Sequence, residues 1–75
     1  MFNENEFLRK VGEGLRLERK RNGLSQSELA ELSALHKNFI GHIERGEKSP
    51  TLVSLLRICS ALGINLGEFF QQQNL

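Results

Sequence analysis

The stretch GLSQSELAELSALHKNFIGHIERG, residues 23–46, decides how this chain folds. Near its start, S-Q-S-E at residues 25–28 forms a capping box. Its serine hydroxyl and its glutamate carboxylate each accept a hydrogen bond from a backbone amide that the first turn of a helix leaves free. The box predicts a helix over residues 26–33, about two turns long. We expect Leu29 and Ala30 of this helix to face the core.

A second short helix follows after a tight break at residues 34–35. It is predicted over residues 37–45, with Ile40 and Ile43 turned inward, and Gly46 ends it. Two short helices joined by so tight a turn form the helix-turn-helix arrangement, whose second helix can enter the major groove of DNA. The first helix crosses the sugar-phosphate backbone and points its free N-terminal amides at a phosphate.

Three more helices are predicted outside this stretch, because capping residues and glycines divide the rest of the chain in the same way. They are expected over residues 5–22, over residues 52–62, and over a last short segment that carries Leu66, Phe69 and Phe70. Residues 71–75 are expected to fray. The predicted fold class is therefore all-α, with five helices in one compact domain over residues 1–75.

Composition fits a small globular protein and excludes several other classes. Of the 75 residues, 39% are hydrophobic and 25% are charged, which is too apolar for a disordered chain. No apolar run approaches the roughly 20 residues that span a membrane, and the acidic, polar N-terminus predicts no signal peptide. The lone cysteine forms no internal disulfide, so we expect a protein of the reducing cytoplasm with no membrane partner. The net charge of +1 neither requires nor excludes a nucleic acid.

The chain lacks the patterns typical of an enzyme, a cofactor site or a metal site. It has no glycine-rich phosphate loop. His36 and His42 are six residues apart, whereas two ligands on one helix face stand three or four apart. Cys59 lies on the apolar stripe of its helix and is expected in the core. We therefore expect neither catalysis nor a metal, cofactor or small-molecule ligand.

Polar side chains gather on the outward face of the second short helix. Lys37 can donate to O6 and N7 of guanine, Asn38 can pair with adenine, and His42 lies further along the same face. Gly41 on this face would let the helix approach the bases closely. Gln26, in the first turn of the preceding helix, is a candidate for binding a phosphate. An ordinary solvated helix surface is the alternative interpretation of these side chains.

Arg19 and Glu44 interrupt the apolar stripes of their helices. Each occupies a position where the helical spacing calls for a residue of the core. Two opposite charges out of pattern in so small a core predict a partly buried ion pair. This pair would join the first helix to the third and have an architectural role.

Most of the chain, from about residue 11 to residue 70, resembles the Cro/phage-repressor-like helix-turn-helix family, also called the xenobiotic-response-element family. The resemblance rests on four motifs together. They are the arginine-rich end of the first helix, G-L-S-Q-x-E-L-A at residues 23–30, I-x-x-I-E-R-G at residues 40–46 and P-T-L at residues 50–52. Within the family, LHKNFIGHIERGEKSPTL is similar to the controller proteins of restriction–modification systems. The resemblance implies a compact five-helix fold of the lambda-repressor type.

The resemblance also implies a role for each matching position. The residue that opens the second helix contacts a phosphate, and here it is Gln26. Exposed residues of the third helix read bases, and here they are Lys37, Asn38 and His42. Further phosphate contacts fall on Arg45, Lys48 and Ser49. The family's core ion pair matches Arg19 and Glu44. Dimer contacts commonly come from the last two helices, here Leu62, Ile64, Leu66, Phe69 and Phe70.

Four positions depart from the family pattern, and one of them is Ser33, which stands where the family is often apolar. Ala34 stands where the tight turn usually has glycine, which costs about 1 kcal/mol if the alanine is left-handed. His36 replaces the usual serine or threonine cap of the third helix, and we expect its side chain to face a phosphate instead. Leu32 stands where the family is generally polar, and either packing or a partner contact would account for it.

Together these patterns predict a transcriptional regulator of a bacterium or phage that binds double-stranded DNA at the nucleoid. As a homodimer with recognition helices about 34 Å apart, it would read a pseudo-palindromic operator and control its own operon. The apolar residues between 62 and 70 exceed what so short a chain is expected to bury, which favours an interface there, although they could also complete the core. The alternative is a DNA-binding antitoxin or adaptor whose main partner is another protein. Such antitoxins often carry an extra segment, so the short chain favours a regulator that works alone.

Overall fold

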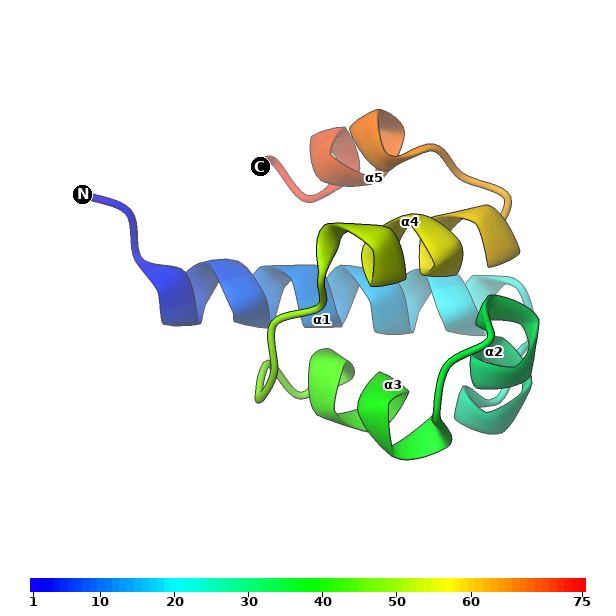
Figure 1. Cartoon of the computed structure of the whole chain (residues 1–75). Helices are drawn as coiled ribbons and strands as arrows, with labels where there is room; N and C mark the ends of the chain where they lie inside the picture. The colour runs from blue at the N-terminus through cyan, green and yellow to red at the C-terminus, as the bar shows by residue number, and fades with distance from the viewer.

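Five helices and no strand make up the protein in a computed structural model that describes residues 1–75. The helices are α1 (Glu4–Arg21), α2 (Gln26–Ser33), α3 (Lys37–Glu44), α4 (Leu52–Ala61) and α5 (Leu66–Gln72) (Figure 1). The all-α class and the five predicted helices are confirmed. The predicted ends of the first four helices differ from the observed ends by at most one residue.

The long helix α1 is the element along which the others are arranged (Figure 1). It packs against α3 on one side and against α5 on the other, while α2 contacts both α3 and α4. In Figure 1, α2 and α3 therefore occupy one edge of the molecule, away from α5. This arrangement leaves the outer side of α3 uncovered by any other helix.

Side chains cap the helix starts at the positions that the sequence indicates. In the capping box of α2, the Glu28 amide donates to the Ser25 hydroxyl at 3.0 Å and the Ser25 amide donates to the Glu28 carboxylate at 2.8 Å. Hydrogen bonds from the Ser25 backbone and hydroxyl lower the pKa of Glu28. Thr51 caps α4 and Asn65 caps α5 through the same kind of bond, at 3.0 and 2.7 Å.

Eleven buried apolar residues form one core to which all five helices or their caps contribute. They are Val11, Leu15, Leu29, Ala30, Ile40, Ile43, Leu55, Ile58, Cys59, Leu62 and Phe69. Burial raises the pKa of the Cys59 thiol, and the nearby Glu18 carboxylate adds to the effect. A thiol held neutral in this way is unreactive, so Cys59 serves as a small apolar core residue.

Leu62 and Phe69, expected at an interface between two copies, lie in this core instead. The chain bends by 87° between α4 and α5, which folds α5 back over α1 and turns Phe69 inward. Ile64, Leu66 and Phe70 are half-buried and pack against the same core. No single helix is long and apolar enough to cross a membrane; only the bent α4–α5 pair, taken together, has the length and composition for it.

The segment expected to fray from residue 71 makes several contacts in the structure. Helix α5 continues to Gln72, and the Leu75 amide donates to the Phe70 carbonyl at 2.9 Å across a left-handed Asn74. The side chain of Gln73 lies against Gly14 of α1. A C-terminal capping motif and a contact with α1 therefore hold the segment.

Ala34, the residue that joins α2 to α3, is left-handed, with φ 57° and ψ 42°. An L-residue with a Cβ pays about 1–2 kcal/mol for this conformation. We expect Ala34→Gly to raise the free energy of unfolding by about 0.5–1 kcal/mol, after allowing for the greater freedom of glycine in the unfolded chain. Urea denaturation measures the change. The matched control is Ala61→Gly at the end of α4, which we expect to be destabilising by a similar amount. A loss of stability in Ala34→Gly would contradict the argument.

Candidate nucleic-acid interface

The first turn of α2 and the outer face of α3 enclose a shallow polar hollow of about 160 Å³. It has no apolar lining residue and is bordered by Gln26, Lys37, Asn38, Gly41, His42 and Arg45. These six residues are called the recognition surface below. The structure thus brings together five side chains that the sequence singled out separately, one from α2 and four from α3 or its C-terminal cap.

The periodicity of α3 determines which residues reach the recognition surface. Ile40 and Ile43 are buried against α1 and α2, so the opposite side of α3 faces solvent. Gly41 lies at the floor of the hollow. A Cβ there would stand 3.1 Å from the Arg45 guanidinium and 3.5 Å from the Gln26 amide oxygen. The missing side chain at residue 41 therefore gives the neighbouring Gln26 and Arg45 room to lie across the helix.

Arg19 and Glu44 form a two-pronged ion pair behind this surface. Nε and one terminal nitrogen of Arg19 donate to the two carboxylate oxygens of Glu44 at 2.7 and 3.0 Å. The other terminal nitrogen donates to the carbonyl of Leu24 at 2.9 Å. Only 10% of the arginine side chain and 3% of the glutamate side chain are exposed. The pair joins α1 to α3 and holds the loop that leads into α2.

Gln26 connects the recognition surface to that ion pair. Its amide nitrogen donates to Glu44 at 3.1 Å, so this carboxylate receives three hydrogen bonds and each of its oxygens has a partner. The bond fixes the Gln26 side chain against α3. Gln26 opens α2, and the first backbone amides of that helix have no acceptor within it. A phosphate placed there would meet these amides and the positive end of the helix dipole.

The family model described as "Helix-turn-helix", HTH_3, matches residues 15–69. This chain belongs to that helix-turn-helix family. As a member, it is a DNA-binding transcription regulator, and the recognition surface lies on the motif that gives the family its name.

Individual relatives of this helix-turn-helix protein include controllers of restriction–modification systems. The control protein C.SmaI of Serratia marcescens is 38% identical over 65 residues, which are 87% of this chain and 77% of that protein. The crystal structure of the restriction–modification controller protein C.AhdI from Aeromonas hydrophila superimposes with a TM-score of 0.84 at 42% identity, covering 87% of this chain and 98% of that one. The transcriptional regulator PuuR of Escherichia coli is 39% identical over 54 residues, 72% of this chain and 29% of that protein.

His36 caps α3 of this helix-turn-helix protein, contrary to the expectation that a histidine would leave the cap and face a phosphate. Its Nδ1 accepts a hydrogen bond from the Asn38 amide at 3.1 Å. A ring nitrogen can replace the usual hydroxyl because its lone pair lies at a comparable reach. Since Nδ1 accepts, the neutral ring carries its proton on Nε2, which stays available as a donor on an exposed side chain.

Lys48 and Ser49, the remaining expected phosphate contacts, lie in the loop between α3 and α4 of the helix-turn-helix protein. Both are exposed. The Ser49 hydroxyl makes only a long contact, 3.4 Å, with the Pro50 carbonyl. This loop follows directly on the C-terminal end of the recognition helix, so its side chains can reach the backbone beside the groove that α3 would enter.

Glu47 is a site residue that the sequence patterns did not indicate, because it lies outside α3. Its carboxylate contacts Nδ1 of His42 at 2.8 Å and forms an ion pair with Nε of Arg45 at 3.1 Å. The hydrogen bond from Arg45, and then that from His42, holds the pKa of Glu47 below its usual value. The only feature of the sequence that could have indicated Glu47 is its position directly after the glycine that ends a helix. Such a glycine turns the chain back toward the face of that helix.

Proposed function

We propose that this protein is a regulator of the restriction–modification controller type, which acts in the cytoplasm and controls its own operon. It binds a pseudo-palindromic operator as a homodimer. The observation that carries the proposal is the recognition surface, a wholly polar face formed by both helices of the motif. The similarity to C.SmaI and C.AhdI over most of the chain supports the controller type.

In this proposal α3 enters the major groove with its exposed face toward the base edges. Lys37, Asn38 and His42 contact bases, because they stand on the solvent side of the helix, opposite Ile40 and Ile43. Phosphates on either side are bound by polar groups around the rim of this face. These groups belong to Gln26, His36, Arg45, Lys48 and Ser49.

Fluorescence anisotropy tests the proposal, with the DNA immediately upstream of the protein's own gene beside a scrambled duplex of equal length. We expect the upstream duplex to bind tighter by about 10³-fold or more, the usual margin of a sequence-specific binder. The slope of affinity against salt concentration then counts the phosphate contacts. Equal affinity for the two duplexes would contradict control of its own operon.

Asn38→Ala is expected to cost about 1–3 kcal/mol of binding free energy and to relax preference at one base position, because it removes a base contact from the groove. The matched control is Lys48→Ala in the following loop. We expect that change to weaken binding to all duplexes alike and to reduce the salt slope by about one. Competition anisotropy with single-base variants of the bound duplex separates the two effects. Loss of preference in Lys48→Ala, but not in Asn38→Ala, would reverse the assignment.

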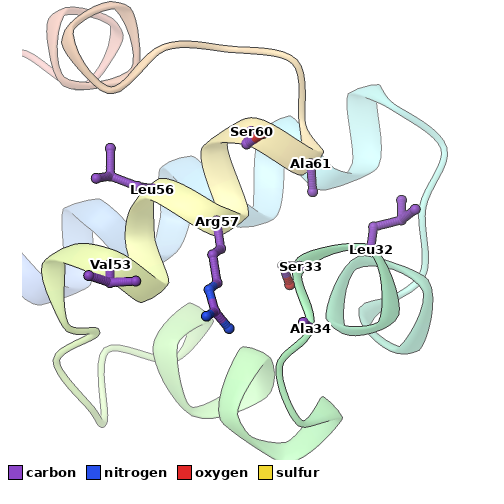
Figure 2. Close-up of a pocket in the computed structure, with 8 residues that line it drawn as sticks. All are labelled: Leu32, Ser33, Ala34, Val53, Leu56, Arg57, Ser60 and Ala61. Carbon is purple, nitrogen blue, oxygen red and sulfur yellow. The ribbon is translucent and has the colours of Figure 1, made fainter.

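The homodimer is proposed to form through an apolar surface between α2 and α4, because the expected interface residues Leu62 and Phe69 are in the core. A hollow of about 610 Å³ lies there, and Figure 2 shows Leu32, Val53 and Leu56 around it, with Arg57 extending between the two helices. Leu32, Val53 and Leu56 are 62%, 60% and 46% exposed, and Leu52 beside them is exposed as well. The surface shares no residue with the recognition surface, so one copy can bind a second copy and DNA together.

We favour a second copy of this chain as the partner that covers this surface. A two-fold axis would bury the exposed leucines and valine of one copy against those of the other. Ile64, Leu66 and Phe70 are half-buried, pack against the core and do not line this surface.

Val53→Glu is expected to convert a dimer into a monomer, because it places a charge within the apolar contact. Leu17→Glu on α1 is the control, as Leu17 is also exposed but lies on another helix. Sedimentation equilibrium of the three proteins at tens of micromolar measures the mass, and circular dichroism verifies the fold. A wild type that stays monomeric at high micromolar concentration, both free and on DNA, would overturn the homodimer.

A further inference from the structure

His42 is the one base-contact candidate whose side chain already contacts another side chain of the protein. Its Nδ1 lies 2.8 Å from a carboxylate oxygen of Glu47. The chain brings Glu47 there by a left-handed turn at Gly46, and the Glu47 amide donates to the His42 carbonyl at 2.9 Å. Backbone geometry, as well as the side-chain contact, therefore places Glu47 beside the ring.

The contact determines where the ring proton lies. An ionised carboxylate has only acceptor atoms, so a separation of 2.8 Å from Nδ1 requires a proton on Nδ1. Arg45 competes for the same nitrogen, because its guanidinium lies 3.4 Å away and would need the lone pair of Nδ1. The shorter contact prevails, since 3.4 Å is long for a hydrogen bond whereas two bare acceptors at 2.8 Å would repel.

Arg45 helps Glu47 to hold this position. Its Nε lies 3.1 Å from the second carboxylate oxygen, so the carboxylate is fixed between the two residues. The contact with Arg45 is also the largest cause of the lowered pKa of Glu47, which keeps the carboxylate ionised and able only to accept.

We propose that Glu47 is a positioning residue that selects the bases His42 can read. With the proton of the neutral ring held on Nδ1, Nε2 is left with a lone pair and can only accept a hydrogen bond. In the major groove the donors to such an acceptor are the amino groups of adenine and cytosine, whereas guanine and thymine present acceptors. His42 then favours adenine or cytosine on the strand that it faces. This inference rests on the proposed function, in which α3 enters the major groove.

The ring proton can be located without DNA, by the nitrogen-15 resonances of His42 in the free protein at about pH 8, where imidazole is neutral. We expect Nδ1 to be the protonated nitrogen in the wild type. In Glu47→Gln the amide offers both a donor and an acceptor to Nδ1, so we expect a mixture of the two tautomers. Glu13→Gln, which removes a charge on distant α1, should leave the wild-type pattern. A wild-type ring protonated on Nε2 would overturn the proposal.

Base preference is measured by selecting tight binders from duplexes with a randomised central segment. The position at which His42→Ala becomes indifferent identifies the base that His42 reads. There we expect the wild type to favour adenine or cytosine by roughly fivefold or more, and Glu47→Gln to lose most of that ratio. Glu13→Gln should keep it, although both glutamine variants remove one negative charge. An unchanged base preference in Glu47→Gln would overturn the inference. Failure to select any sequence would instead overturn the proposed function, and the tautomer measurement would then decide the role of Glu47.

Discussion

Arg19→Ala is expected to lower the free energy of unfolding by about 3–5 kcal/mol, the usual cost of removing one partner of a buried ion pair. The substitution leaves the Glu44 carboxylate buried with only the Gln26 amide as a partner and also frees the Leu24 carbonyl. A domain of this size has a total stability of roughly 5–10 kcal/mol, so the variant should be close to unfolded at physiological temperature. Urea and thermal denaturation followed by circular dichroism measure the loss.

Two comparisons make the Arg19 result specific. Arg16→Ala changes an exposed arginine of the same helix and should alter stability by no more than about 0.5 kcal/mol. Arg19→Met combined with Glu44→Leu removes both charges and should recover much of the loss, because no unpaired charge remains buried. An Arg19→Ala protein that is fully stable but has a changed base preference would contradict the architectural role.

Gly12→Ala is expected to destabilise the protein by about 3 kcal/mol, at the upper end of the range for overpacking. A Cβ at this position would collide with the Ile43 carbonyl oxygen. It would also lie 2.7 and 2.9 Å from the carbonyl oxygen and carbon of Glu44. All three atoms belong to the backbone of α3, so relief requires α1 and α3 to separate, which also strains the Arg19–Glu44 pair. Thermal denaturation reports the change.

Gly14→Ala is the matched control, two residues further along α1. The three atoms nearest to its Cβ would all belong to the end of the Gln73 side chain, which can rotate away. The gain in helix propensity, about 1 kcal/mol, should therefore be kept. Equal effects of the two substitutions would show that helix propensity, and not the close approach of α3, governs Gly12.

Local chemistry made the helices of this protein predictable. The capping box at Ser25 and the glycine at residue 46 mark where chain segments begin and end, and these effects depend on residues three or four apart. The inward stripes also depended on spacing alone, which is why Ile40 and Ile43 were placed in the core. Ala34 kept the left-handed turn because the packing of α2 against α3 outweighs its cost of about 1–2 kcal/mol.

Long-range packing limited the prediction of surfaces. Whether Phe69 faces the core or a partner depends on the angle at which α5 folds back, which no short-range pattern encodes. The apolar surface on α4 could be recognised only in the structure, because only there is it clear that Val53 and Leu56 lie on a side of the helix that stays exposed. Glu47 was missed because a loop residue reached His42 through a turn of the backbone.

Two separate surfaces on one small core account for the proposed activity. The Arg19–Glu44 pair fixes α3 to α1, and Gln26 ties the start of α2 to the same carboxylate, so that the two helices of the motif are positioned before DNA arrives. A preorganised surface loses little conformational entropy on binding. The α2–α4 surface lies apart from it and can set the distance between two recognition helices.

In the proposed function the protein contacts DNA through the recognition surface. Amide chemical-shift changes in the labelled protein, recorded as the selected duplex is added, test this contact. We expect the largest changes on Gln26, on residues 36–42 and on residues 45–49, with α5 and the start of α1 unaffected. Tight, sequence-specific binding with the changes concentrated on α1 or α5, and none on α3, would contradict it.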